Sequence, residues 1–132
     1  MPIYGVYDFV DPGGTWHHRK LLPVLERHVM KTTREEDPKA FEKASPLHRV
    51  RPDAPPFFVV HGAADTLVPI EEARAFVRAL RERSRSPVVY AEIPGAQHAF
   101  ELFPSVRSQL VRNGVERFLA FAWSEHRRSA SA

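Results

Sequence analysis

The sequence predicts an α/β fold built on a parallel sheet of about three strands with flanking helices. Three short runs rich in β-branched and aromatic residues indicate buried strands, and amphipathic helical patterns follow the second and third runs. The order strand, helix, strand, helix implies right-handed crossovers between parallel strands. The 132 residues have the length of a single domain.

The three apolar runs are expected to be strands covered on both faces. The first occupies residues 1–10, with its apolar part at residues 3–9. The second spans residues 57–60 and the third spans residues 88–93. None of them alternates strictly between apolar and polar residues, which is typical of strands buried on both faces of a parallel sheet.

Two longer helices are predicted within residues 56–126. Between the second and third strands, four residues spaced at i, i+3, i+4 and i+7 form one apolar stripe: Ala73, Phe76, Val77 and Leu80. After the third strand, Ser105 is a candidate N-cap for a long helix. The predicted buried side of this helix comprises Val111, Val115, Phe118, Leu119 and Ala122. The tail at residues 127–132 is expected to be disordered.

The stretch between the first and second strands has a different composition. Residues 11–55 are rich in charged residues, proline and histidine, with short helical patterns around residues 20–31 and 38–44. They predict an inserted, lid-like segment of small helices. Three strands with their helices do not make a self-sufficient sheet, because at least one edge would stay open. We therefore expect the chain to be the C-terminal portion of a larger α/β domain.

Composition excludes or disfavours several classes of protein. The net charge is +3, but basic residues alternate with acidic ones, as in "EEARAFVRALRER", so nucleic-acid binding is not expected. Because there are no cysteines, disulfides and thiolate metal sites are excluded. No apolar run has the length of a membrane span, and the N-terminus lacks the basic-then-apolar order of a signal peptide. The compartment is not predicted.

The chemistry-bearing residues follow the second and third strands. The second strand continues into "HGAADTLVP", residues 61–69, and the third is followed by "GAQHAF", residues 95–100. Open α/β sheets keep their active sites at the carboxyl ends of parallel strands. The two loops should therefore bring Asp65 and His98 together. An aspartate that accepts the proton of one imidazole nitrogen orients the ring as a general base.

These phrases also carry a resemblance to a known family. "PPFFVVHGAADTLVP", "AEIPGAQHAF" and the upstream "ASPLHRVRPDAPP" resemble the C-terminal part of α/β-hydrolase-fold carboxylesterases and lipases, the hormone-sensitive-lipase-like and related bacterial esterases. The resemblance implies a serine hydrolase that acts on a small ester or lipid without cofactor or metal. The family carries its triad in the order Ser, Asp or Glu, His, so its acid maps onto Asp65 and its base onto His98.

The sequence departs from the family pattern at the nucleophile. No G-x-S-x-G motif occurs, and the HGGG-type oxyanion loop is also missing. The resemblance thus implies that the serine lies outside this chain, in a missing N-terminal part of the same domain. By itself the chain is expected to be inactive, and its open sheet edge could pair with another copy.

Two alternative functions stay open. The first is a fragment of a serine peptidase of the prolyl-oligopeptidase type, which carries similar acid and histidine loops on the same fold. The second is a catalytically inactive remnant with a binding or structural role. Under that reading Asp65 is a turn residue and His98 a structural loop histidine. His61, which ends the second strand, is interpreted as a hydrogen-bonded structural residue.

Histidines of the inserted segment could suggest a metal site. Three histidines lie close in sequence near the start of the inserted segment: His17, His18 and His28. No carboxylate at a convincing spacing completes the set, so we expect solvated or packed side chains there and no bound metal.

Overall fold

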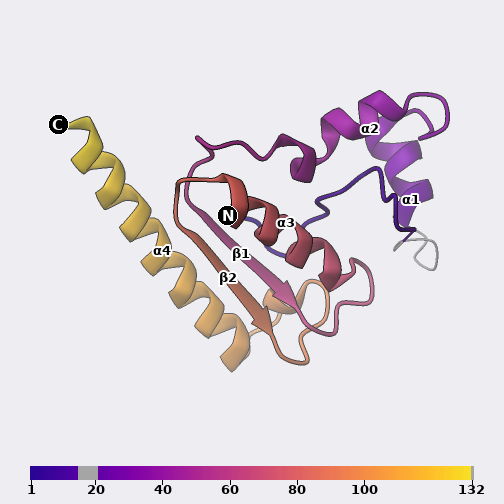
Figure 1. The fold of residues 1–132 in the computed structure, drawn as a ribbon. Coiled ribbons are helices and arrows are strands. Elements are labelled where there is room, and N and C mark those ends of the chain that lie inside the picture. Colours follow the sequence, from indigo (N-terminus) through magenta and orange to yellow (C-terminus); the bar gives the residue numbers. More distant parts are fainter. Residues whose placement is uncertain (15–20, 132) are drawn as a thin grey trace.

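A computed structural model describes residues 1–14 and 21–131 of the chain. Its centre is a two-stranded parallel sheet of β1 (Phe57–Gly62) and β2 (Val88–Ile93), paired in register from Phe57 opposite Val88 to Gly62 opposite Ile93. Helix α3 (Ile70–Arg83) connects the strands, and α4 (Val106–Ala130) follows β2. The α/β class, the parallel pairing and both long helices are as predicted (Figure 1).

The alternation of side chains along β1 separates two apolar clusters. Val59 packs on one face with the predicted stripe of α3, including Phe76 and Leu80, and Tyr7 stacks on Phe76 with ring centroids 4.4 Å apart. Phe58 and Val60 point to the other face and pack against α4. Both clusters are buried, so β1 is covered on both faces. This burial is what fixes the carboxyl end of β1 in space.

The first predicted strand is where the structure differs most from expectation. Residues 3–9 pair with β1 only through one parallel bridge, between Ile3 and Val60, so the sheet has two strands and not three. The Tyr4 amide donates to the Val60 carbonyl at 2.8 Å, but Tyr4 has a φ of 42°, which turns the chain out of the extended conformation. An apolar composition did not reveal this interruption.

Further along the same segment, backbone amides are satisfied by side chains. The Tyr7 and Asp8 amides both donate to Oε2 of Glu72, at 3.0 and 2.8 Å, and the Phe9 amide donates to Oγ of Ser45 at 2.8 Å. These bonds take the place of a strand ladder. The segment therefore presents fewer open donors than the predicted edge strand would.

The inserted segment is helical in the described residues. It contains α1 (Leu21–Val24), a π-helical turn η1 (Leu25–Met30), α2 (Pro38–Ala44) and a 3₁₀ turn η2 (Pro46–Arg49). Asp37 caps α2 by accepting from the Ala40 amide at 3.0 Å, and Phe41 is completely buried. In Figure 1 these elements lie to one side of the sheet, beyond α3. Their role as a lid stays a prediction.

Helix α4 begins as predicted and ends later than predicted. Ser105 forms a capping box with Ser108, and Val111 and Phe118 are buried. Leu119, expected on the buried side, is 53% exposed. The helix continues to Ala130, so most of the tail expected to be disordered is helical. Across residues 1–14 and 21–131, no helix combines the length and the apolar character needed to cross a membrane.

Candidate active site

The acidic loop leaves the end of β1 in a tight turn that buries Asp65. Its amide donates to the Gly62 carbonyl at 3.2 Å, and its Oδ1 accepts from the backbone amides of Leu67 and Val68 at 2.8 and 2.9 Å. The carboxylate has no exposed surface. A side chain that bonds the amides two and three residues further on is held in one rotamer, so the loop itself aims the second oxygen, Oδ2.

The loop after β2 approaches the first loop very closely. The Ala96 carbonyl accepts from the Ala64 amide at 3.0 Å, and the Ile93 carbonyl accepts from the Ala63 amide at 2.9 Å. A Cβ atom on Gly62 would lie 2.4 Å from the Ala96 oxygen. Gly62 is therefore required for this close approach of the two backbones.

A side-chain contact adds a second connection between the loops. The amide and the hydroxyl of Thr66 both donate to Oε1 of Gln97, at 3.3 and 3.2 Å. Gln97 directly precedes His98. The loop that carries the histidine is therefore bonded to the loop that carries Asp65 through a side chain as well as through the backbone. No motif in the sequence pointed to Gln97.

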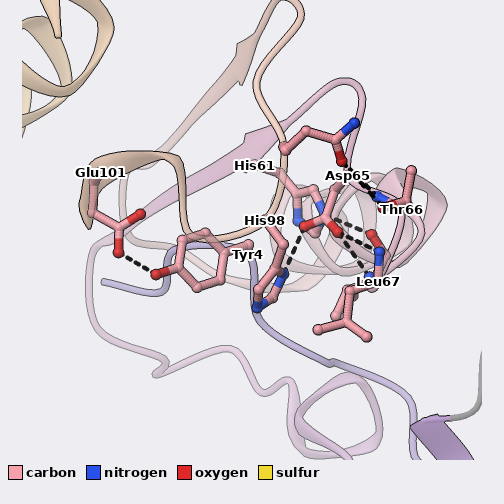
Figure 2. A network of polar contacts seen from close by, with 9 residues as sticks. Tyr4, His61, Asp65, Thr66, Leu67, His98 and Glu101 are labelled. Carbon is pink, nitrogen blue, oxygen red and sulfur yellow. Dashed lines mark hydrogen bonds and ion pairs between the residues drawn. The ribbon is translucent and has the colours of Figure 1, made fainter. Parts of the chain in front are cut away.

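The two loops bring together the residues that the sequence singled out. Nδ1 of His98 lies 2.9 Å from Oδ2 of Asp65, across 33 positions of sequence (Figure 2). Because a carboxylate only accepts, Nδ1 carries the ring proton, and Nε2 of the neutral imidazole is left as an acceptor. The His98 side chain is 28% exposed, whereas that of Asp65 is buried. This is the geometry of a base whose orienting group is shielded from water.

His61 lies on the same carboxylate. Its Nε2 is 3.1 Å from the Val68 carbonyl oxygen and 3.4 Å from Oδ2 of Asp65. Since a carbonyl only accepts, Nε2 carries the proton of this ring. Nδ1 is buried and has no hydrogen-bond partner among the residues that the structure describes. The sequence predicted a hydrogen-bonded structural histidine here but not its contact with Asp65.

A second neighbour of His98 comes from the N-terminal segment. The ring centroid of Tyr4 lies 4.2 Å from that of His98, with the two planes tilted by 51°. The Tyr4 hydroxyl donates to Oε1 of Glu101, three residues after His98, and Figure 2 shows the tyrosine between the two. Burial and this bond raise the pKa of Tyr4 to about 12. No motif in the sequence pointed to Tyr4 or Glu101.

The described residues supply neither a nucleophile nor a metal ligand set. No serine hydroxyl hydrogen-bonds His98 within the described part of the chain. Those residues contain no group of three or more histidine, cysteine, aspartate or glutamate side chains that could hold a metal. His17 and His18 lie outside the described residues. Asp65 and His98 lie in a geometry suited to proton transfer, with no described serine placed to exchange a proton with His98.

An open apolar cavity of about 530 Å³ lies apart from this pair. It is formed by the N-terminal segment, residues 44–55 and the inner side of α3. Neither Asp65 nor His98 lines it. The cavity therefore is not adjacent to the reacting atoms of the candidate site.

Comparison with known proteins places these features in a family. Residues 4–126 match the family described as the prolyl oligopeptidase family. Three curated proteins of Mycobacterium tuberculosis are also similar. The probable carboxylic ester hydrolase LipM is 48% identical over 91% of this chain, esterase LipQ is 44% identical over 89%, and esterase LipC is 43% identical over 89%. The chain spans only 28%, 28% and 29% of their lengths, respectively.

Solved structures show the same fold. Esterase 2 of Thermogutta terrifontis with butyrate bound is 29% identical, with a TM-score of 0.59 over 66% of this chain and 32% of that chain. A truncated carbohydrate esterase from gut microbiota has a TM-score of 0.68 over 91% of this chain and 41% of its own, at 18% identity. At that identity the second likeness concerns the fold alone.

Proposed function

Because the chain belongs to the prolyl oligopeptidase family, on the α/β-hydrolase fold, we propose that it supplies the acid and the general base of a serine hydrolase that cleaves carboxylic esters. The observation that carries this proposal is the 2.9 Å contact between Nδ1 of His98 and Oδ2 of Asp65 at the ends of adjacent parallel strands. Such a pair performs proton transfer to and from a positioned hydroxyl.

The mechanism assigns a distinct step to each group. Nε2 of His98 takes the proton of the serine hydroxyl as that oxygen attacks the ester carbonyl, and it then gives the proton to the leaving alkoxide. Asp65, held by the Leu67 and Val68 amides, keeps Nδ1 protonated and stabilises the imidazolium. The same base next activates water, which releases the acid and frees the serine. The serine and the oxyanion donors belong to a segment outside residues 1–132.

The proposed substrate class rests on the curated relatives. All three are described as esterases or as a carboxylic ester hydrolase, at 43–48% identity over most of this chain. The chain covers less than a third of each of them, so the activity proposed here is that of a larger protein containing these residues. Its partner within that protein is the serine-bearing part of the same domain.

The test uses what we call the complete enzyme: this sequence joined to a serine-bearing segment, either its own or the unmatched remainder of LipM. We expect it to hydrolyse p-nitrophenyl butyrate and to be labelled by a fluorophosphonate. His98→Ala should lower kcat by about 10⁴-fold or more, and Asp65→Asn by about 10³- to 10⁴-fold. His126→Ala, a substitution of the same type at an exposed position of α4, is the matched control. Near-normal turnover in the His98 variant would overturn the assignment.

The family match favours a second candidate, peptide hydrolysis. Its description is that of prolyl oligopeptidases, and an acid–histidine pair of this geometry serves amides as well as esters. Comparing kcat/KM for p-nitrophenyl butyrate and for a blocked Gly-Pro-p-nitroanilide separates the two activities. A higher kcat/KM for the anilide would replace the ester proposal. If the fluorophosphonate labelled neither the parent nor the variants, an inactive remnant would be favoured.

A further inference from the structure

Tyr4 occupies an unusual position against the candidate base. Its ring lies 4.2 Å, centroid to centroid, from the imidazole of His98, and the ring of Phe100 packs edge-on against Tyr4 at 6.3 Å. The residue comes from the N-terminal segment, whereas His98 and Phe100 belong to the loop after β2. Figure 2 shows the tyrosine ring lying directly beside the imidazole. The contact therefore joins two parts of the chain that are distant in sequence.

The backbone at Tyr4 is in an unfavourable conformation. Its φ of 42° lies in the left-handed region, which bulky residues rarely adopt. The conformation is held by neighbouring bonds, since the Tyr4 amide donates to the Val60 carbonyl at 2.8 Å and the Val60 amide donates to the Pro2 carbonyl at 3.0 Å. An extended Tyr4 would continue pairing along β1. The observed turn instead delivers its side chain to His98.

The hydroxyl group fixes the other end of the ring. It donates to Oε1 of Glu101, in the 3₁₀ turn η3 (Phe100–Leu102) that immediately follows His98 and Ala99. Because the pKa of Tyr4 is raised to about 12, chiefly by burial, the hydroxyl keeps its proton at neutral pH and remains a donor. Tyr4 is thus tied to β1 through its backbone and to the histidine loop through its side chain.

Asp65 alone does not fix the plane of the imidazole. It holds Nδ1, but a ring held at one atom keeps freedom to tilt about that hydrogen bond, which moves Nε2. The Tyr4 ring packs beside the imidazole, with centroids 4.2 Å apart and planes inclined by 51°, and so restricts that tilt. We propose that Tyr4, anchored by Glu101, is a positioning residue that holds the His98 ring in the orientation in which Nε2 meets the serine. This inference rests on the function proposed above.

The kinetic test compares three variants of the complete enzyme. Tyr4→Leu removes the flat ring and should lower kcat by about 10- to 100-fold, with KM changed less than about threefold, because misplacing a catalytic group by a fraction of an ångström to an ångström has costs of this order. Tyr4→Phe keeps the ring but loses the anchor and should lower kcat by only about 2- to 5-fold. Glu101→Leu removes the acceptor of the Tyr4 hydroxyl and should lower kcat by about the same 2- to 5-fold as Tyr4→Phe.

A second measurement does not depend on turnover. The proton on Nδ1 of His98 should give a downfield ¹H NMR signal in the parent, identified by its loss in His98→Ala. In Tyr4→Leu that signal should broaden or exchange faster with water, while the signals of the backbone amides keep their positions. Retained kcat together with an unchanged Nδ1 signal in Tyr4→Leu would overturn the proposal. If His98→Ala itself were active, the proposed function would fail instead, so the two failures are distinguishable.

Discussion

Oδ2 of Asp65 meets Nδ1 of His98 at 2.9 Å, while Oδ1 of the same carboxylate accepts the Leu67 and Val68 amides. The two oxygens thus have separate tasks, one fixing the carboxylate in its loop and the other orienting the imidazole. This division depends on how closely the loops after β1 and β2 approach each other. Gly62 lies at this approach, and His61 contacts the same carboxylate.

Gly62→Ala should disrupt the site because the new methyl group would lie 2.4 Å from the Ala96 carbonyl oxygen, a backbone atom that can move only with its loop. We expect a loss of about 1–3 kcal/mol in the free energy of unfolding and a lower kcat in the complete enzyme. Denaturant unfolding and ester turnover measure these effects. Gly114→Ala is the control, since its nearest atom is Cε1 of Phe58 at 3.4 Å. That change should stabilise α4 by about 0.5–1 kcal/mol. Equal stability of the two variants would contradict the prediction.

His61→Leu should destabilise the protein and impair the acid. It removes the donor at 3.1 Å from the Val68 carbonyl and the nitrogen at 3.4 Å from Oδ2 of Asp65. A buried acceptor left without its partner costs about 1–3 kcal/mol. His61→Gln places an amide donor near the Nε2 position and should recover part of the loss. Denaturant unfolding checks both variants, and a leucine variant as stable as the parent would show that His61 is only a packing residue.

The periodicity and composition of short stretches correctly predicted both strands of the sheet and both long helices. The stripe of α3 and the Ser105 cap appear where the periodicity placed them, and both β1 and β2 are strands. Because parallel strands joined by one helix end at the same sheet edge, the meeting of Asp65 and His98 also followed from the order of elements. These features require no knowledge of distant contacts.

Several features that the sequence missed depend on distant contacts. The composition of residues 3–9 suits a strand, but the left-handed Tyr4 ends the pairing after Ile3, and no residue type announces that turn. The contacts of Tyr4 with His98 and Glu101 follow from the same turn. The helical end of α4 was missed because a polar, serine-rich tail has the composition of a disordered one.

Ser105→Ala should weaken the start of α4. The Ser105 hydroxyl accepts from the Ser108 amide at 3.1 Å, and the Ser105 amide donates to the Ser108 hydroxyl at 2.9 Å, so the change removes half of a capping box. We expect a loss of about 1 kcal/mol in the free energy of unfolding. Ser124→Ala, at an exposed position further along α4, should stay within about 0.5 kcal/mol of the parent. Thermal unfolding of both variants measures the difference, and equal Tm values would argue against the cap.

Low pH should remove the contribution of the Arg74–Glu92 ion pair to the stability of the fold. Nε and Nη2 of Arg74 donate to the two carboxylate oxygens of Glu92 at 2.9 and 2.8 Å, and these bonds lower the pKa of Glu92 below its usual 4.5. A group with a lowered folded-state pKa stabilises above its unfolded value and loses that effect as pH falls through the folded value. Arg74→Gln should therefore lower Tm slightly at pH 7, and the difference should shrink as pH falls below 4.5 and vanish once Glu92 is protonated in the folded state.

The control for this pair lies on the same helix. Arg78 is exposed on α3 and forms no ion pair with the described residues. Arg78→Gln should show little change in Tm at either pH. Added salt should also shrink the Arg74→Gln difference, since the pair is at the surface. A difference that persists at low pH would mean that Arg74 contributes through packing.

The 132 residues on their own should hydrolyse no ester above the rate of the His98→Ala variant. They contain no G-x-S-x-G, and an imidazole without a positioned hydroxyl or oxyanion donors gives little acceleration.

We also expect the 132 residues on their own to self-associate. Five apolar side chains around the start and middle of α4 are at least 63% exposed: Leu102, Phe103, Val106, Leu110 and Trp123. Association should proceed through such side chains more than through residues 3–9, whose amides at Tyr7, Asp8 and Phe9 are already bonded. Sedimentation velocity and p-nitrophenyl butyrate turnover test this. A sharp monomer peak would contradict the association, and turnover blocked by a fluorophosphonate would reveal a nucleophile within these residues.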